Sequence, residues 1–129
     1  MKLGFSWNVS AEGDFAPYCS SDVVGKDGLS FLACLLMDDG GQGHFYMIPW
    51  VDEGIARVYA VIKGEAAAVN WDRDAWGAEI SLDGAEVYSL YDEKYSEMIT
   101  VTMFLHALLA WREFIKSTPQ IGIVQEVEI

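Results

Sequence analysis

Residues 76–119, WGAEISLDGAEVYSLYDEKYSEMITVTMFLHALLAWREFIKSTP, hold the strongest local structural signals in the chain. Within this stretch the apolar runs 76–82 and 86–91 flank an Asp83-Gly84 pair. Such a pair favours a tight hairpin turn, because both central residues of that turn take positive φ. The sequence therefore predicts a β-hairpin here, followed by an acidic connection.

A helix is predicted in the second half of the same stretch. Its apolar residues recur at the spacing of one helical face, namely Phe104, Leu108, Trp111 and Ile115. Thr102 is the expected N-cap, because its hydroxyl can accept a backbone N–H that has no helical partner. Lys116 falls in the last turn, where a cation suits the helix dipole, and the Ser-Thr-Pro segment 117–119 ends the helix.

Further strands are predicted on both sides of this hairpin and helix. Residues 120–129 alternate in polarity, which is typical of a half-exposed closing strand. Upstream, apolar and β-branched runs predict four more strands, at 29–37, 43–51, 55–62 and 66–71. The strand at 29–37 is apolar throughout and is expected at the centre of the sheet. Asp27-Gly28 and Asp39-Gly40 are expected to form hairpin turns.

These elements together predict an α+β fold for a single domain of residues 1–129. We expect an antiparallel meander sheet, one long helix near the C-terminus packed on a sheet face, and a closing C-terminal strand. The length of 129 residues suits one domain, and an apolar content of 52% is enough for a folded core.

The net charge of −12 excludes several classes of function. Binding to nucleic acid phosphates needs clustered Lys and Arg, so the chain is not expected to bind nucleic acid. Anionic membrane surfaces repel it for the same reason. Residues 98–111 form the longest mostly apolar window, which is too short to span a membrane, and no secretory signal precedes residue 8. A cytoplasmic protein is therefore expected.

The spacing of the cysteines, histidines and glycines matches no catalytic or metal-binding motif. Cys19 and Cys34 are expected to be free thiols, with Cys34 inert inside an apolar run. His44 and His106 are expected to face solvent. The Gly-Gly-Gln-Gly segment 40–43 fits a loop better than a phosphate cradle, because no Lys-Ser/Thr pair follows it. No catalytic residue, no metal and no cofactor is therefore expected.

Acidic residues lie next to large aromatic residues at several places in the sequence. Solubility alone would place acids at turns, but aromatic anchors surrounded by charge are also typical of protein interfaces, and an acidic surface speeds association with a cationic partner. Trp7 and Trp111 are expected in the core, while Trp71 and Trp76 could belong to either setting. The candidate partner-binding residues are Asp38, Asp39, Trp50, Asp52, Glu53, Trp71, Asp72, Asp74, Asp92, Glu93 and Glu97.

Residues 80–119 resemble the C-terminal part of a known group of small bacterial proteins. The resemblance lies in the hairpin at 80–88, the acidic connection, and the apolar helix that opens at 100–102 and ends at 110–115. These are the immunity proteins that neutralise toxins of contact-dependent inhibition and related polymorphic-toxin systems. The resemblance implies an acidic inhibitor, not an enzyme, that binds a cognate basic toxin of the nuclease type. It transfers no individual functional residue, because such proteins bind unrelated toxins through different surfaces.

Two other functions fit the same composition. One is another acidic binding module, such as a nucleic-acid mimic or an adaptor. The other is a small enzyme that uses a carboxylate pair, one of them buried with a raised pKa. The chain is expected to be a monomer or a weak dimer. Residues 120–129 could self-associate if they form an edge strand, and Glu126 and Glu128 would then act as guards against it.

Overall fold

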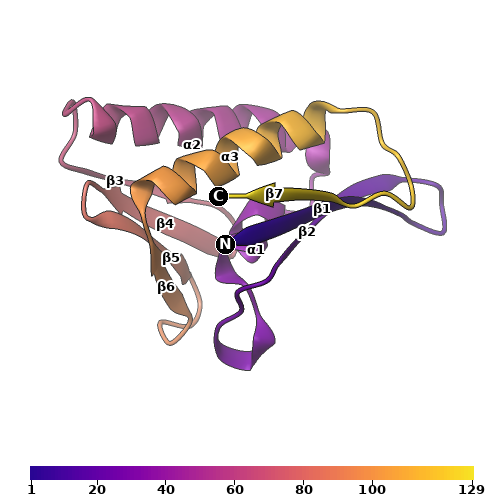
Figure 1. Cartoon of the computed structure of the whole chain (residues 1–129), viewed down its shortest axis with the longest axis horizontal. Helices are drawn as coiled ribbons and strands as arrows, with labels where there is room; N and C mark the ends of the chain where they lie inside the picture. Colours follow the sequence, from indigo (N-terminus) through magenta and orange to yellow (C-terminus); the bar gives the residue numbers. More distant parts are fainter.

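The computed structural model describes the backbone of residues 1–129 and every side chain except that of Lys26. It confirms the α+β class, with three α-helices, seven strands and two antiparallel sheets (Figure 1). The elements in chain order are β1 (Lys2–Val9), β2 (Phe15–Ser21), η1 (Lys26–Gly28), α1 (Phe31–Met37), η2 (His44–Tyr46), α2 (Met47–Ile62), β3 (Ala68–Asp72), β4 (Trp76–Ser81), β5 (Gly84–Ser89), β6 (Ser96–Ile99), α3 (Val101–Lys116) and β7 (Gln125–Glu128).

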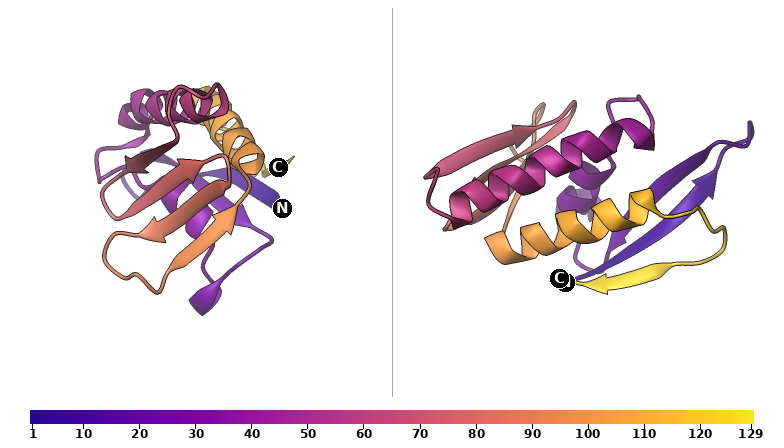
Figure 2. Two further views of the ribbon diagram at one scale, coloured as in Figure 1. Left: turned by 90° about the vertical axis from the view of Figure 1, so that its left-hand side faces the viewer. Right: turned by 90° about the horizontal axis from the view of Figure 1, so that it is seen from above.

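The strands form two sheets rather than the single meander that the sequence predicts. One sheet has the order β3-β4-β5-β6 and is itself a meander; the other has the order β2-β1-β7. The helices cover one side of the four-stranded sheet, because α2 packs on β3 and β4 while α1 packs on β4 and β5. Figure 2 shows the four strands with α2 and α3 above them and the opposite sheet face uncovered. Among the described residues, no helix has the length and apolar composition needed to cross a membrane.

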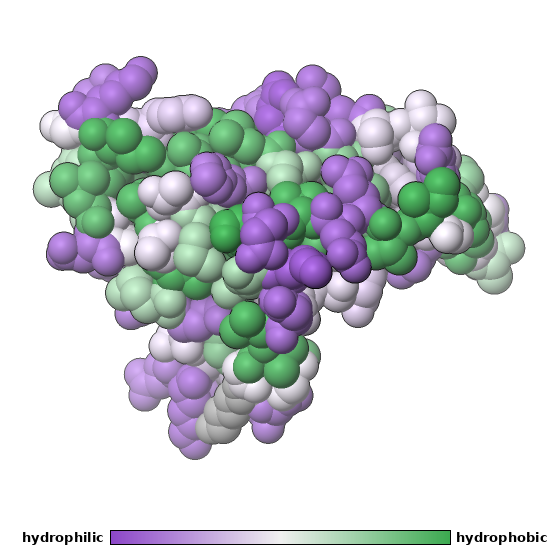
Figure 3. All heavy atoms as spheres, viewed as in Figure 1, coloured by the Kyte–Doolittle hydropathy of each residue, from purple (hydrophilic) through white to green (hydrophobic). Residues whose placement is uncertain are grey.

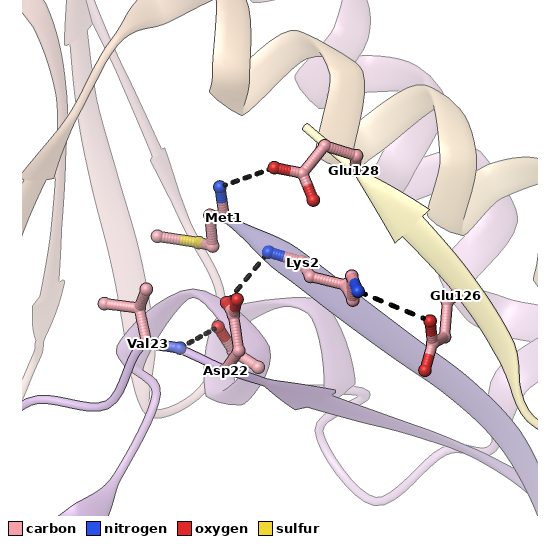
Figure 4. A network of polar contacts seen from close by, with 7 residues as sticks. Met1, Lys2, Asp22, Val23, Glu126 and Glu128 are labelled. Atoms are coloured by element: carbon pink, nitrogen blue, oxygen red, sulfur yellow. Dashed lines mark hydrogen bonds and ion pairs between the residues drawn. The ribbon is translucent and has the colours of Figure 1, made fainter.

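The closing strand lies at the edge of its sheet and is held by charges. It is shorter than the predicted 120–129, and it pairs with β1. The Glu128 carboxylate lies 3.2 Å from the N-terminal amine, and Glu126 lies 3.6 Å from the Lys2 ammonium (Figure 4). The Lys2 N–H also donates to Asp22 at 2.8 Å. The two glutamates that the sequence suggests as guards therefore also form ion pairs with the first two residues of the chain, Met1 and Lys2.

One hydrophobic cluster fills the space between the two sheets and the helices. At its centre the indoles of Trp50 on α2 and Trp71 on β3 stack with ring centroids 4.0 Å apart. The Trp71 Nε1 donates to the Trp50 carbonyl at 3.2 Å. Gly54, one turn after Trp50, makes room for this pair, since a Cβ there would lie 2.6 Å from the Trp71 ring. The missing side chain allows α2 to approach the sheet closely.

Helix α3 and the hairpin β4–β5 confirm the strongest predictions from sequence. The four residues of the predicted apolar face are buried, Phe104, Leu108, Trp111 and Ile115. The N-cap is Thr100 rather than Thr102, because the Thr100 hydroxyl accepts the N–H of Met103 at 3.0 Å. The predicted strand at 66–71 is also present, as β3.

The strands predicted at 29–37, 43–51 and 55–62 are wrong, because those segments contain helices. Residues 31–37 form α1, and residues 47–62 form α2. The β-branched residues of α2 favour strands locally, but the face formed by Trp50, Gly54, Val58 and Val61 is buried at helical spacing, and this tertiary packing prevails. Pro49 lies in the first turn of α2, where proline is tolerated.

The turns predicted at Asp27-Gly28 and Asp39-Gly40 do not join paired strands: the first lies between β2 and α1, and the second between α1 and η2. The first pair lies in η1, where Asp27 has a positive φ of 61°. The second lies in the loop between α1 and η2. The Asp-Gly signal therefore marks a positive-φ position in both places, but only Asp83-Gly84 lies within a β-hairpin.

Candidate functional site

Asp38 and Asp39, two of the predicted partner-binding acids, hold a loop in place. The Asp38 carboxylate accepts the backbone N–H groups of Ala75 at 2.7 Å and Trp76 at 3.0 Å. The Asp39 carboxylate accepts those of Gly41 at 2.7 Å and Gly43 at 3.2 Å. The Asp38 bonds attach the loop after α1 to the β3–β4 turn, and the Asp39 bonds hold that loop in its own conformation. The sequence could not distinguish such backbone-binding acids from acids that await a partner.

Three more of the predicted acids bind groups within the chain. Glu97 on β6 accepts the N–H of Leu32 at 2.9 Å and so caps the start of α1. Asp52 pairs with Arg112 across α2 and α3. Glu53 pairs with Arg57 one turn along α2. Each of these carboxylates supports the fold, whatever else it contacts.

The tryptophans of the predicted set lie in the core rather than on a surface. Trp50 is 7% exposed and Trp71 is 1% exposed, so neither side chain can anchor a partner. This corrects their assignment as partner-binding residues. Trp76, left undecided by the sequence, is half-buried and stacks on Phe31 with centroids 5.6 Å apart. Trp7 and Trp111 are buried, as expected.

The other predicted acids are spread over separate turns. Asp92 accepts the N–H of Lys94 at 3.0 Å within its own turn. Asp74 and Glu93 are exposed in the β3–β4 and β5–β6 connections. The structure therefore does not bring the predicted set together as one surface. Asp72, however, belongs to a cluster that the sequence analysis missed.

The uncovered face of the four-stranded sheet gathers three carboxylates, from Asp72, Glu79 and Glu86, all exposed. We call this surface the acidic face and define it by its outward residues Asn70, Asp72, Glu79, Glu86, Tyr88 and Met98. The four strands contain no Lys and no Arg. The acidic face therefore presents one sign of charge on a flat, rigid support.

Two of these carboxylates face each other directly. Glu79 on β4 is the cross-strand partner of Glu86 on β5. Like charges in this position destabilise a sheet, since the side chains of opposed residues lie close together. The next neighbours, Asn70 beyond Glu79 and Met98 beyond Glu86, carry no compensating charge.

Tyr88 lies beside this pair and is held by hydrogen bonds. Its hydroxyl donates to the Asp72 carboxylate at 2.6 Å and accepts from the Asn70 amide at 3.1 Å. The Asp72–Tyr88 bond passes over Gly77, the strand residue between them, where a Cβ would lie 2.1 Å from the Asp72 oxygen. Glycine at this position is what allows the two side chains to meet.

The surroundings of Tyr88 keep its hydroxyl protonated. Burial, followed by the hydrogen bond to Asp72, raises the pKa of Tyr88 to about 12. A tyrosine is neutral at pH 7 even at its ordinary pKa of 10.0, and the bonds to Asp72 and Asn70 fix this neutral ring among acids. A guanidinium group binds well in such a place, because it can contact an aromatic face and pair with carboxylates at once.

The histidines and cysteines do not assemble a second site. Among the described side chains, no group of three or more His, Cys, Asp or Glu is placed to hold a metal ion. Cys19 and Cys34 are free, as expected, but Cys34 is half-buried rather than enclosed. Burial raises the pKa of Cys19 to about 12 and also raises the pKa of Cys34, so neither thiol is activated. His44 is half-buried rather than solvent-facing, while His106 is exposed.

Sequence reasoning missed Glu79, Glu86 and Tyr88, although it predicted their hairpin. The signal was available in the alternation of strands 76–82 and 86–91, which places Glu79 and Glu86 on the polar face. The register across four strands, which brings Asp72 to the same face, follows only from the tertiary structure. In comparisons with known proteins, no protein-family model, curated protein or solved structure matches the chain.

Proposed function

We propose that this chain is a cytoplasmic immunity protein that neutralises a cognate basic toxin, of the nuclease type, by tight stoichiometric binding. The acidic face is the contact surface in this proposal. The observation that carries it is the set of three outward carboxylates on four strands that contain no Lys and no Arg. The resemblance of residues 80–119 to immunity proteins supports the same function.

Electrostatics favour a basic partner for this surface. The chain carries a net charge of −12, which attracts a cationic protein from a distance and raises the association rate. At close range Tyr88 supplies a fixed aromatic ring, and Met98, which is 62% exposed, supplies a flexible apolar contact. Aromatic anchors surrounded by charge are typical of the residues that dominate interface energies.

The opposed pair Glu79 and Glu86 also supports a cationic partner. The repulsion between these carboxylates costs stability in the free chain. A Lys or Arg side chain placed between them would remove that repulsion and form two ion pairs. Binding energy is thus available at this position without any rearrangement of the sheet.

The proposal is tested with the protein encoded next to this chain's gene. That protein is expressed with and without this chain, and cell growth and the association rate of the two purified proteins are measured. We expect growth inhibition that this chain relieves, and an association rate that falls as salt concentration rises. An adjacent product that does not inhibit growth, or that this chain does not bind, contradicts the proposed function.

A pair of double variants locates the contact surface. Glu79→Lys with Glu86→Lys changes the acidic face, while Glu12→Lys with Glu65→Lys changes the net charge equally at exposed sites elsewhere. We expect the first variant to lose protection and to bind at least about tenfold more weakly, and the second to keep both properties. Equal effects of the two variants would show that only the net charge matters and would exclude the acidic face as the contact.

A further inference from the structure

Four strands lie at the edges of the two sheets, namely β2, β7, β3 and β6. An edge strand has backbone N–H and C=O groups without a strand partner, and natural proteins commonly protect them. In an antiparallel pair, residues that bond to the neighbouring strand alternate with residues whose backbone groups point the other way. On an edge strand these alternate residues are edge-facing, and the four edges of this chain differ in how such groups are covered.

Two of the edges are covered by helices. On β2 the edge-facing residues include Pro17, which has no N–H, and Cys19, whose N–H donates to the Met37 sulfur of α1 at 3.3 Å. On β3 the edge-facing carbonyl of Asn70 accepts from the Arg57 guanidinium of α2. Helix side chains therefore already occupy the backbone groups that a further strand would need.

The edge of β7 has cations beside it. Its edge-facing residues are Glu126 and Glu128. Their carboxylates lie 3.6 Å from the Lys2 ammonium and 3.2 Å from the N-terminal amine, in that order. A basic segment that approaches this edge gains little attraction, because each carboxylate is already paired with a cation of the same chain.

The edge of β6 is open and borders the acidic face. The Ser89 N–H donates to the Tyr95 carbonyl at 2.9 Å, and this pairing leaves Ser96 and Met98 edge-facing. Both residues are exposed, and within the described part of the chain nothing bonds to their backbone groups. Figure 2 shows β6 as the outermost strand of its sheet. A strand can be added here without the loss of any existing bond.

The described charges around β6 are mostly negative. Glu86 is the cross-strand neighbour of Met98 on the acidic face. At one end of β6, the β5–β6 turn has two acids and one cation, Asp92, Glu93 and Lys94, and Figure 3 shows hydrophilic residues gathered over this turn. At the other end lie Asp83 and the N-terminal amine, which is paired with Glu128. These charges favour a cationic segment at the edge.

We propose that the edge of β6 binds an extended segment of the basic partner, which adds to the sheet as a further strand with Lys or Arg at alternate positions. Backbone bonds to Ser96 and Met98 give affinity, and the alternate cations give specificity. The added strand lies about 10 Å from β5, twice the strand spacing. A Lys or Arg stem can therefore pack along the flexible Met98 side chain and bring its charge close to Glu86.

The charges also decide between a basic partner and a second copy of the chain. Two β6 strands side by side would join two acidic faces on chains that each carry −12, so a second copy fits this edge poorly. The inference rests on the proposed function for the identity of its partner. It adds the place and the manner of the contact.

The first test is amide hydrogen exchange, measured by NMR on the purified chain alone and with a capped peptide of four Arg-Val repeats. In the free chain we expect fast exchange at Ser96 and Met98 and slow exchange at Glu97 and Ile99. At a peptide concentration of ten times its Kd, exchange at Ser96 and Met98 should slow about tenfold, because only the free chain exchanges there.

A capped peptide of four Arg-Pro repeats is the control, since it has the same charge but lacks the N–H groups of a strand at every second residue. It should protect neither amide. Unchanged exchange with the Arg-Val peptide overturns the proposal. Exchange at Met98 that slows as the free chain is concentrated also overturns it, because the edge would then bind a second copy.

The second test removes a donor from the edge. Met98→Pro lacks the edge-facing N–H, and edge strands tolerate proline at such a position. We expect it to bind the Arg-Val peptide about tenfold more weakly than Met98→Ala, which lacks the same side chain but keeps the N–H. Glu126→Pro makes the matched change on β7 and should bind as the wild type does. Equal binding by the two Met98 variants overturns the proposal. Circular dichroism checks folding, and if Met98→Pro does not fold, the exchange experiment on the wild type decides.

The protein encoded next to this chain's gene separates the inference from the proposed function. In a complex with that protein, the amides of Ser96 and Met98 should be protected. A toxin that this chain neutralises while both amides exchange freely supports the proposed function and overturns the strand addition. Protection by the Arg-Val peptide, together with an adjacent product that does not inhibit growth, supports the edge site and contradicts the proposed function.

Discussion

Gly54 shows how one residue sets the distance between α2 and the sheet. In an exposed helix, Gly→Ala stabilises by about 1 kcal/mol. At this position a Cβ would lie 2.6 Å from the Trp71 ring, which is rigid and 1% exposed. We expect Gly54→Ala to lower the free energy of unfolding by about 2 kcal/mol, because overpacking exceeds the gain in helix propensity.

The measurement for Gly54 is urea unfolding followed by tryptophan fluorescence. Ala56→Gly is a suitable control, because Ala56 is exposed on the same helix and its change tests helix propensity alone. The free energy of unfolding of Ala56→Gly should be about 1 kcal/mol lower than that of the wild type. A Gly54→Ala variant more stable than the wild type would show that α2 can move away from Trp71 without cost.

Tyr88 predicts a loss of stability in alkali. Its pKa in the folded chain is about 12 because of burial and the bond to Asp72, against an ordinary value of 10.0. Between these values the folded chain retains a proton that the unfolded chain releases, so stability falls as pH rises from 10 to 12. The free energy of unfolding of Tyr88→Phe should fall less over this range. An ultraviolet titration of this variant should show one fewer late-ionising tyrosine than that of the wild type. Equal alkaline losses in both chains would contradict the assignment.

At the scale of elements, Glu79 and Glu86 lie opposite each other on β4 and β5, so replacing one of them should raise the free energy of unfolding. Glu86→Lys converts the repulsion with Glu79 into an attraction across β4 and β5. We expect the free energy of unfolding to rise by about 0.5 kcal/mol beyond the effect of net charge alone. Glu12→Lys makes the same change in net charge on the β1–β2 turn and serves as the reference in urea unfolding. If Glu86→Lys gains no more than Glu12→Lys, the two glutamates do not interact.

Local signals decided which elements could be predicted from the sequence. The α3 stripe and the Asp83-Gly84 hairpin are encoded within a few residues, and both are present. Residues 31–37 are uniformly apolar and show no period, and α1 depends on caps from Ser30 and from Glu97, the latter 65 residues away in sequence. Strands β1 and β2 were not predicted, although Leu3, Phe5 and Trp7 alternate in burial as a half-buried strand should.

The sequence predicted the residue types of the candidate site, acidic and aromatic, but not which residues form it. Acids beside aromatic residues indicated an acidic surface, but several of the selected acids bind groups within the chain instead. Asp38 and Asp39 accept backbone N–H groups, and Asp52 on α2 pairs with an arginine. Acids that follow the period of a strand, such as Glu79 and Glu86, share one face of a rigid sheet. Pairing between strands decides which carboxylates become neighbours, and this pairing depends on contacts distant in sequence.

At the scale of the whole molecule, the uneven charge has a cost that salt should reveal. The chain has 20 acidic residues against 8 Lys and Arg, so long-range repulsion opposes the compact state. The ion pairs that salt would weaken involve mostly exposed carboxylates, each contributing less than about 1 kcal/mol. We therefore expect the urea midpoint to rise as sodium chloride increases from about 0.01 M to 1 M, because the Debye length shrinks from about 30 Å to 3 Å. A variant with Glu12, Glu65 and Glu86 all changed to Gln should respond less, since it has less repulsion to screen. A urea midpoint that falls with added salt would show that the ion pairs outweigh the repulsion. The net negative charge would then not destabilise the folded chain.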